Sequence, residues 1–190
     1  MRDGGQGRRA RGTALIQLVK LLRGQRKKGP LRGLSPQAKA LLDEHILPNE
    51  WYPLEPFREM MDFLHRELCG SSEEATLQAG EAGGKVLLTG PHKAFIQPGD
   101  PAASVFAMRH IWRAYYDFGE LSGEMIDGPA VRFTLKGYPD ITVAHGLMIA
   151  GWGVAAALVA GAADAGAEIL ERPWDGDLQL VYRVFWSNAE

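Results

Sequence analysis

Residues 141–163 read ITVAHGLMIAGWGVAAALVAGAA, a segment without Asp, Glu, Lys or Arg. An Asp-Gly pair flanks it on each side, Asp127-Gly128 before it and Asp175-Gly176 after it, and both pairs lie between strand-like runs. Asp-Gly is typical of hairpin turns because it tolerates positive φ. The order hairpin, long helix, hairpin predicts an α+β fold: N-terminal helices packed on a four-stranded antiparallel sheet of ββαββ order, with one long central helix.

The central segment is about long enough to cross a bilayer, which takes ~20 residues. We interpret it instead as a buried helix, because it contains His145, hairpins bracket it closely, and both of its faces are apolar. A helix that is apolar all round is sandwiched between other elements. Gly146, Gly151 and Gly153 predict close backbone approach, or room for a ligand, at this helix. No transmembrane span is therefore expected.

A rival interpretation of the same segment is a dinucleotide-binding βαβ unit. Gly151, Gly153 and Ala156 match Gly-x-Gly-x-x-Ala, and Glu171 lies 20 residues beyond Gly151. The motif stands too near the C-terminus for a doubly wound sheet, and His145 with the glycine after it interrupts the supposed first strand. A dinucleotide-binding enzyme that uses Gly151 and Gly153 is kept as the less favoured alternative.

Charge divides the chain into a basic arm and an acidic body. Residues 1–32 hold ten Arg or Lys and a single acid, Asp3, whereas the remainder holds 11 basic and 22 acidic residues. Glycines at positions 4, 5, 7 and 12 predict a flexible basic tail over residues 1–12, followed by one domain over residues 13–190. We expect the arm to pack against its own body or to be solvated. Nucleic acid is not an expected partner, because nothing in the arm would stack on bases.

Cys69 is the lone cysteine, which excludes an internal disulfide and a Cys-x-x-Cys metal or redox motif. This composition fits a reducing compartment, and we expect a cytoplasmic protein. The sequence contains no nucleophile elbow, P-loop or His-Glu-x-x-His motif, and no histidine pairs with another at a metal-ligand spacing. We therefore expect no catalytic residue and no metal site.

Apolar and aromatic side chains at helical spacing surround two histidines. His145 shares a face with Met148 and Trp152, and His110 shares one with Phe106 and Ala114. The plain interpretation of each histidine is a satisfied core residue, and that of the aromatics Trp112, Tyr115 and Tyr116 is core packing. The functional interpretation is an apolar pocket with the candidate ligand-binding residues His110, Trp112, Tyr115, His145, Met148 and Trp152.

The arrangement resembles the ligand-binding fold shared by haem-nitric-oxide/oxygen-binding (H-NOX) domains, 4-vinyl-reductase-type domains and TRAPP tethering subunits. Four segments carry the resemblance: residues 79–81 (AGE), 108–112 (MRHIW), 146–152 (GLMIAGW) and 180–186 (LVYRVFW). The chain is also similar to a family common in myxobacteria whose third helix starts with the same Tyr-Pro pair, here Tyr52-Pro53. The resemblance covers about residues 12–187.

The H-NOX resemblance has a direct consequence for haem. His110 falls close to the position of the proximal haem ligand in those domains, and a Tyr-x-Ser-x-Arg haem-propionate signature should follow. Residues 133–139 read FTLKGYP instead, without Tyr, Ser and Arg at that spacing. The cysteine-rich pattern of many 4-vinyl-reductase-type domains is missing too. No cofactor is therefore expected, and haem is kept as the alternative that uses His110.

The preferred hypothesis is a non-enzymatic binding or sensor module, or a protein-interaction scaffold, with an apolar pocket for a small hydrophobic ligand. Its expected partners are that ligand or a partner protein, with a homodimer as one form of the scaffold. The alternatives are a haem-based gas sensor and, less favoured, the dinucleotide-binding enzyme.

Overall fold

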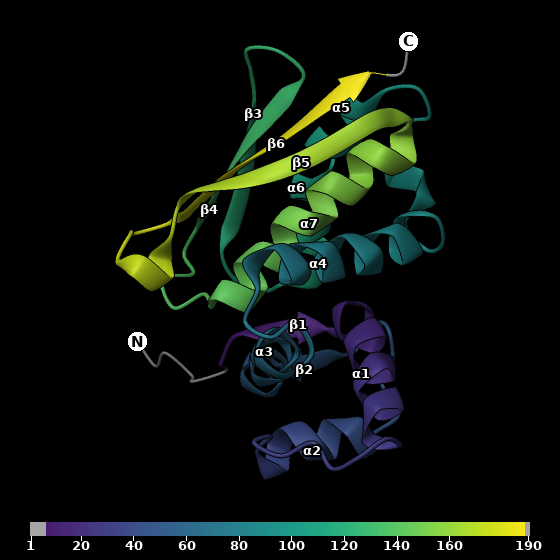
Figure 1. The fold of residues 1–190 in the computed structure, drawn as a ribbon, viewed down its shortest axis with the longest axis vertical. Helices are drawn as coiled ribbons and strands as arrows, with labels where there is room; N and C mark the ends of the chain where they lie inside the picture. Colours follow the sequence, from purple (N-terminus) through teal and green to yellow (C-terminus); the bar gives the residue numbers. More distant parts are fainter. Residues whose placement is uncertain (1–6, 189–190) are drawn as a thin grey trace, which may run out of the picture.

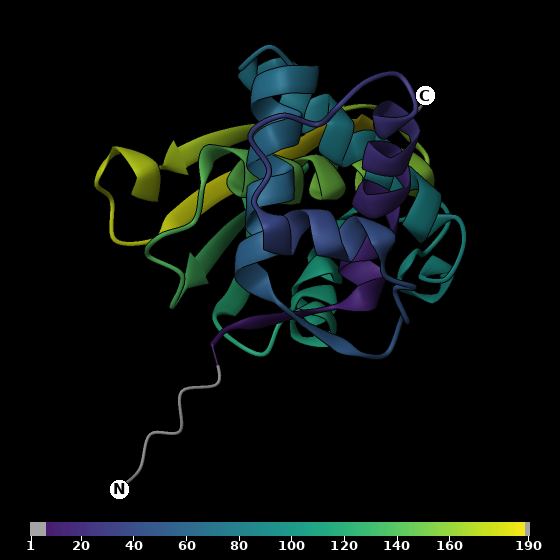
Figure 2. The ribbon, with the colours of Figure 1, turned by 90° about the horizontal axis from the view of Figure 1, so that it is seen from below.

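The computed structural model describes residues 7–188, in which two layers meet. One layer contains β1 (Arg9–Arg11), α1 (Gly12–Arg26), α2 (Pro36–Asp43), β2 (Trp51–Pro53) and α3 (Leu54–Phe63), which continues as a π-helical turn, η1 (Leu64–Leu68). The other contains the main sheet with α4 (Glu73–Leu88) and α7 (Val143–Ala160). Figures 1 and 2 show the first layer packed across one end of the second.

The main sheet has the predicted ββαββ order and is antiparallel throughout. Its strands are β3 (Glu120–Ile126), β4 (Ala130–Lys136), β5 (Ala162–Glu171) and β6 (Leu180–Asn188), arranged β3-β4-β6-β5. The α+β prediction is therefore confirmed, including the long helix between the two hairpins. The apolar residues at positions 178, 180, 182, 184 and 186 predict one buried strand face, and this is confirmed for Leu180, Tyr182, Val184 and Trp186. Leu178 belonged to the predicted face, but it precedes the strand and is 91% exposed.

The two predicted turns differ in detail. Gly128 joins β3 to β4 with a φ of +80°, as an Asp-Gly hairpin requires. Asp175-Gly176 is not a two-residue turn, because a short 3-10 helix, η3 (Pro173–Asp175), lies between β5 and β6. Gly176 ends this helix with a φ of +108°.

Asp100-Pro101 predicts the start of one helix with Val105, Met108, Trp112 and Tyr115 along one side, but the structure divides this helix in two. Asp100 caps α5 (Pro101–Phe106) by accepting a hydrogen bond from the Ala103 N–H, and α6 (Met108–Tyr115) follows after Ala107. A 3-10 turn, η2 (Lys93–Phe95), lies between α4 and α5. The division lets α6 direct its own apolar side toward α7 and the cavity described below.

Helix α7 is the core helix between α4 and the sheet (Figure 1). Its length and composition would suit a membrane span, but 67% of it is buried inside the fold. A Cβ added at Gly151 would lie 2.2 Å from the carbonyl oxygen of Leu77 in α4. One added at Gly153 would lie 2.5 Å from Val184 Cγ2 in β6. The predicted close approach is confirmed on both sides of the helix.

The dinucleotide-binding interpretation of Gly151 and Gly153 is wrong. Both glycines lie in the middle of α7, where a βαβ unit would need a strand and a turn. Their lack of a side chain serves helix packing against α4 and β6, and leaves no phosphate-binding loop at this position.

The predicted flexible tail over residues 1–12 extends too far. Arg9–Arg11 form β1, which pairs with β2, and Gly12 already belongs to α1. Alternation explains this strand: Ala10 is completely buried, whereas Arg9 binds Asp117 and Arg11 stacks over the Trp51 ring. Residues 9–11 of the arm thus pack against the body of the same chain, which is one of the two expected arrangements. The part of the prediction that concerns residues 1–6 lies outside the described residues.

Candidate functional site

An aromatic-lined cavity of about 80 Å³ lies where the two layers meet. Five of the six predicted ligand-binding residues line it: Trp112, Tyr115, His145, Met148 and Trp152. The remaining lining comes from α1, α3, α6, α7, the sheet and the residue after α6: Ala14, Phe57, Met61, Met108, Ile111, Tyr116, Leu121, Ile149 and Tyr182. Both layers of the fold therefore contribute to the cavity wall.

His110 does not belong to this cavity. It is exposed on α6, and helical geometry separates it by about 200° from Trp112, two residues later, which is buried. The buried side of α6 consists of Met108, Ile111, Trp112 and Tyr115. The prediction that His110 lines the pocket is therefore wrong, and the apolar spacing of α6 was the signal that could have excluded it.

His145 is the buried polar centre of the cavity wall, with 1% of its surface exposed. Thr142 caps the start of α7 and accepts a hydrogen bond from the His145 backbone N–H. On the ring, Nε2 lies 2.8 Å from the Tyr116 hydroxyl and Nδ1 lies 3.1 Å from the Tyr138 hydroxyl. Burial, with a smaller effect of Arg58, lowers the pKa of the His145 imidazole to about 3. The imidazole is consequently neutral at physiological pH.

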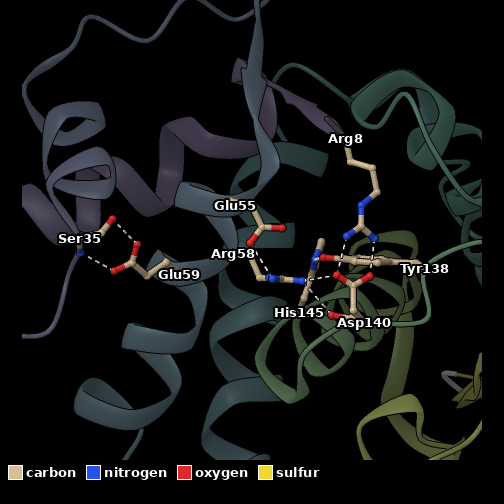
Figure 3. Close-up of polar contacts among 8 residues, drawn as sticks. All are labelled: Arg8, Ser35, Glu55, Arg58, Glu59, Tyr138, Asp140 and His145. Atoms are coloured by element: carbon tan, nitrogen blue, oxygen red, sulfur yellow. Dashed lines mark hydrogen bonds and ion pairs between the residues drawn. The ribbon is translucent and has the colours of Figure 1, made fainter. Parts of the chain in front are cut away.

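Outside this histidine lies an ion cluster centred on Asp140, drawn in Figure 3. Both carboxylate oxygens of Asp140 accept 2.5 Å hydrogen bonds from Arg8, and Oδ2 also accepts one of 2.7 Å from Arg58. Arg58 in turn binds Glu55, at 2.6 Å, in the same helix. These hydrogen bonds hold the pKa of Asp140 well below its usual range. The cluster joins the residue before β1, helix α3 and the β4–α7 connection.

Arg8 also closes one side of the site over aromatic rings. Its guanidinium lies 5.0 Å from the centroid of the Tyr138 ring and 5.3 Å from that of Phe118. Tyr138 is itself 2% exposed, and burial raises the pKa of its hydroxyl. Solvent is thereby kept from the Tyr138 side of His145.

The opposite wall is built from stacked aromatic rings. The rings of Trp112 and Tyr116 stack with centroids 4.1 Å apart, and the Trp112 indole N–H donates to the Phe118 carbonyl at 3.0 Å. Tyr115 meets Trp152 edge to face at 5.6 Å, and its hydroxyl is hydrogen-bonded to His92 Nε2. The polar ends of Trp112 and Tyr115 are thus occupied, which leaves their apolar surfaces toward the cavity.

Tyr116 and Tyr138 carry much of the site's chemistry, yet neither was among the predicted site residues. Tyr116 was interpreted mainly as core, and Tyr138 entered only as part of the stretch that replaces the haem-propionate signature. They lie 29 and seven positions from His145. No periodicity of a single helix or strand links the three, because they meet only through the packing of α6, α7 and the loop before α7.

The arrangement provides no site for a bound metal within residues 7–188, where no group of three or more His, Cys, Asp or Glu side chains converges. A second, more open groove of about 970 Å³ lies over α2, β2 and α3, with charged residues that include Glu55, Arg58, Glu59, Asp62 and Arg66. Within it, Glu59 accepts hydrogen bonds from the Ser35 backbone N–H and hydroxyl (Figure 3). These contacts attach α2 to α3.

Comparison with solved structures finds the same fold in H-NOX domains. An H-NOX mutant from T. Tengcongensis superposes with a TM-score of 0.63 at 14% identity, over 94% of this chain and 98% of that one. An H-NOX protein from S. oneidensis in the Fe(II) ligation state gives 0.68 at 12% identity, over 95% and 97%. An unliganded Fe(II) H-NOX mutant from K. algicida gives 0.62 at 10% identity, over 94% and 97%.

The chain has the H-NOX fold. No protein-family model matches it, and no curated protein sequence matches it either. At these identities the likeness concerns the course of the backbone, so the chemistry of the site must be taken from the chain's own residues. The predicted H-NOX resemblance is confirmed at this level.

The residues of this cavity do not fit a haem. Its volume of about 80 Å³ is far below the ~300–1,000 Å³ of pockets for drug-sized ligands, and haem is a larger molecule still. His110 is exposed, and both ring nitrogens of His145 already have tyrosine partners. An axial ligand must offer a free nitrogen to the iron. The H-NOX fold is thus combined here with a cavity that suits a smaller occupant.

Proposed function

We propose that the chain is a non-enzymatic ligand-binding module, and that its aromatic cavity takes a small hydrophobic molecule. The observation that carries the proposal is a largely apolar, aromatic-lined space beside α7, a helix that elsewhere packs closely through its glycines. Protein interiors leave few voids, and ligand sites are apolar hollows with a few placed polar groups. His145 with its tyrosines provides those polar groups.

The state of His145 supports a binding role over an enzymatic one. A general base works best with a pKa near the operating pH, whereas burial lowers the pKa of His145 to about 3. Both ring nitrogens are also occupied by tyrosine hydroxyls. The group is suited to hold a fixed hydrogen-bonding geometry and not to exchange protons with a substrate at neutral pH.

A sensing role follows from the position of the cavity between the layers. Its wall includes Ala14 of α1 and Phe57 of α3 from one layer, and Met148 of α7 from the other. A ligand that fills the space favours whichever relative placement of the layers accommodates it. We propose that this coupling is how ligand binding is transmitted to the surface of the domain.

The partner and location belong to the same proposal. A protein partner or a second copy of the chain would respond to the ligand-induced change in the domain. The free thiol of Cys69 is consistent with a protein of a reducing compartment such as the cytoplasm. Native mass spectrometry of protein purified from its own host tests both kinds of partner. A retained small-molecule mass supports the ligand site, whereas a bare dimer favours the scaffold.

Xenon provides the direct test, because it occupies apolar cavities without any polar contact. We expect xenon to shift the amide resonances of residues around the cavity in a ¹⁵N-¹H spectrum. Ala14→Leu, which fills the space from α1, should remove these shifts and keep the fold. The matched control is Ala40→Leu, the same change at an exposed position of α2. Xenon shifts that persist in Ala14→Leu would contradict this site.

A further inference from the structure

Three side chains form a hydrogen-bonded row through the cavity wall: Tyr116, His145 and Tyr138. The Tyr116 hydroxyl lies 2.8 Å from Nε2 of His145, and the Tyr138 hydroxyl lies 3.1 Å from Nδ1. Within residues 7–188, neither hydroxyl has another hydrogen-bond partner. The hydroxyls and the imidazole ring therefore bond only to one another, and a further partner could come only from the cavity.

The protons of this row outnumber its hydrogen bonds. Each hydroxyl carries one proton and a neutral imidazole carries one on a single nitrogen, so there are three donors for the two contacts. One nitrogen must accept and the other must donate. Whichever hydroxyl accepts from the ring N–H keeps its own proton without an acceptor. A buried donor left in that state is costly, so an acceptor from outside the row would stabilise it.

The location of the two tyrosines decides which hydroxyl can find such an acceptor. Tyr116 and His145 line the cavity, whereas Tyr138 does not. Tyr138 is instead 2% exposed, beneath the Arg8 guanidinium. With the ring proton on Nε2, Tyr138 donates to Nδ1, and the unused proton belongs to Tyr116 at the cavity. The opposite tautomer leaves the unused proton on Tyr138, where no ligand can reach it.

We infer that Tyr116 presents a hydroxyl donor to the cavity, and that the ligand is a small, mostly apolar molecule with an acceptor oxygen, a carbonyl or an ether. The inference rests on the proposed ligand site and specifies the chemical class of its occupant. Ligand binding then also selects the tautomer of His145, since an acceptor at Tyr116 favours the proton on Nε2. Tyr182 also lines the cavity, and its hydroxyl has no hydrogen-bond partner within residues 7–188. Apart from this second hydroxyl, the remaining wall is apolar or has its polar atoms occupied, so the site can satisfy an acceptor oxygen at Tyr116 and little further polarity.

A ketone and its alkene isostere test this class directly. 2-Butanone and 2-methyl-1-butene have nearly the same shape, but only the ketone accepts a hydrogen bond. We expect Tyr116→Phe to weaken 2-butanone binding about tenfold and to change the Kd of the alkene less than about twofold, as the loss of one buried hydrogen bond predicts. The Kd values come from amide-shift titrations of the full chain.

Tyr115→Phe is the matched control, because Tyr115 also lines the cavity but its hydroxyl is bonded to His92. It should leave the ratio of the ketone and alkene Kd values unchanged. A second readout uses 2-butanone labelled with ¹³C at the carbonyl. The resonance of the ketone bound to the wild-type protein should lie downfield of its resonance when bound to Tyr116→Phe, because only the wild-type cavity offers the hydroxyl donor.

The outcomes separate this inference from the function on which it rests. If Tyr116→Phe weakens both molecules equally, or neither, the donor role is overturned while the cavity remains a ligand site. If the wild-type protein binds neither molecule and takes up no xenon, the proposed ligand site is overturned, and the inference with it. Selective loss of the ketone alone supports both.

Discussion

Arg8 donates two hydrogen bonds of 2.5 Å to Asp140, a residue 132 positions later in the chain. This contact connects the residue before β1 to the loop from which α7 starts (Figure 3). Arg58 of α3 binds the same carboxylate. The three residues hold the two layers together at the edge of the cavity, next to Tyr138 and His145.

The Asp140 cluster should stabilise the fold more than an ordinary surface ion pair. We expect Asp140→Ala to lower the free energy of unfolding by about 1–2 kcal/mol. The loss is no larger because the Asp140 side chain is 46% exposed and solvent screens its ion pairs. The comparison is Asp43→Ala, which breaks the single exposed pair with Arg26 and should cost about 0.5 kcal/mol or less. Urea denaturation measures both. Equal losses would show that the bidentate arrangement adds nothing.

The neutral, buried His145 predicts a loss of stability as the pH falls. Its pKa is about 3 in the folded protein against an ordinary 6.5, so below pH 6.5 the unfolded chain takes up a proton that the folded protein does not. The stability that depends on the neutral imidazole is present above pH 6.5. Between pH 7 and pH 5 the free energy of unfolding should fall by about 2 kcal/mol. His145→Gln should show a correspondingly smaller dependence. Identical slopes for the two proteins over this pH range would refute the assignment.

Helix packing through Gly151 should tolerate no side chain. Gly151→Ala would place a methyl group 2.2 Å from the Leu77 carbonyl oxygen, and we expect it to cost about 3 kcal/mol of stability. Gly83→Ala is the matched control: it lies in α4 with nothing within 4 Å of an added Cβ, and should gain about 0.5–1 kcal/mol. Chemical denaturation of the two variants should give opposite signs. A neutral Gly151→Ala would contradict the close approach of α4 and α7.

Haem reconstitution should fail for this chain despite its fold. We expect no stoichiometric haem after incubation with haemin and desalting, because the cavity holds about 80 Å³ and both nitrogens of His145 are bonded. The measurement is the Soret absorbance per mole of protein. A sharp Soret band that His110→Ala removes would instead establish the haem-sensor alternative.

Local patterns were sufficient for the four strands of the main sheet, the central helix and their order. The absence of acidic and basic residues from residues 141–163 predicts a buried helix, because each turn of a helix with two apolar sides needs a neighbour on both. Strand alternation around Tyr182 and a left-handed glycine at Gly128 likewise depend on adjacent residues only. One pattern left two outcomes open: Gly151 and Gly153 match both a phosphate loop and a helix contact, and the favoured helix contact is confirmed.

The candidate site was predicted in part, where its residues share a helix face. Trp112, Tyr115, Met148 and Trp152 share helix faces with other apolar residues, and a shared face is readable from spacing. His110 was misplaced because a shared face with Phe106 and Ala114 and its likeness to a haem ligand both suggested a pocket residue. Phe106 belongs to α5, and His110 and Ala114 lie on the exposed side of α6. Tyr116 has no helical spacing to read, since it follows the last residue of α6.

The sequence by itself determined the ββαββ order, the buried central helix and the positions of its glycines, because these follow from periodicities of two and 3.6 residues within single segments. Only the tertiary structure decided that Tyr116, His145 and Tyr138 form one hydrogen-bonded row. It also decided that Arg8, bound to Asp140, lies over the Tyr138 ring. Those contacts join residues on separate elements, up to 132 positions apart. Their geometry depends on how whole layers pack, which no local pattern contains.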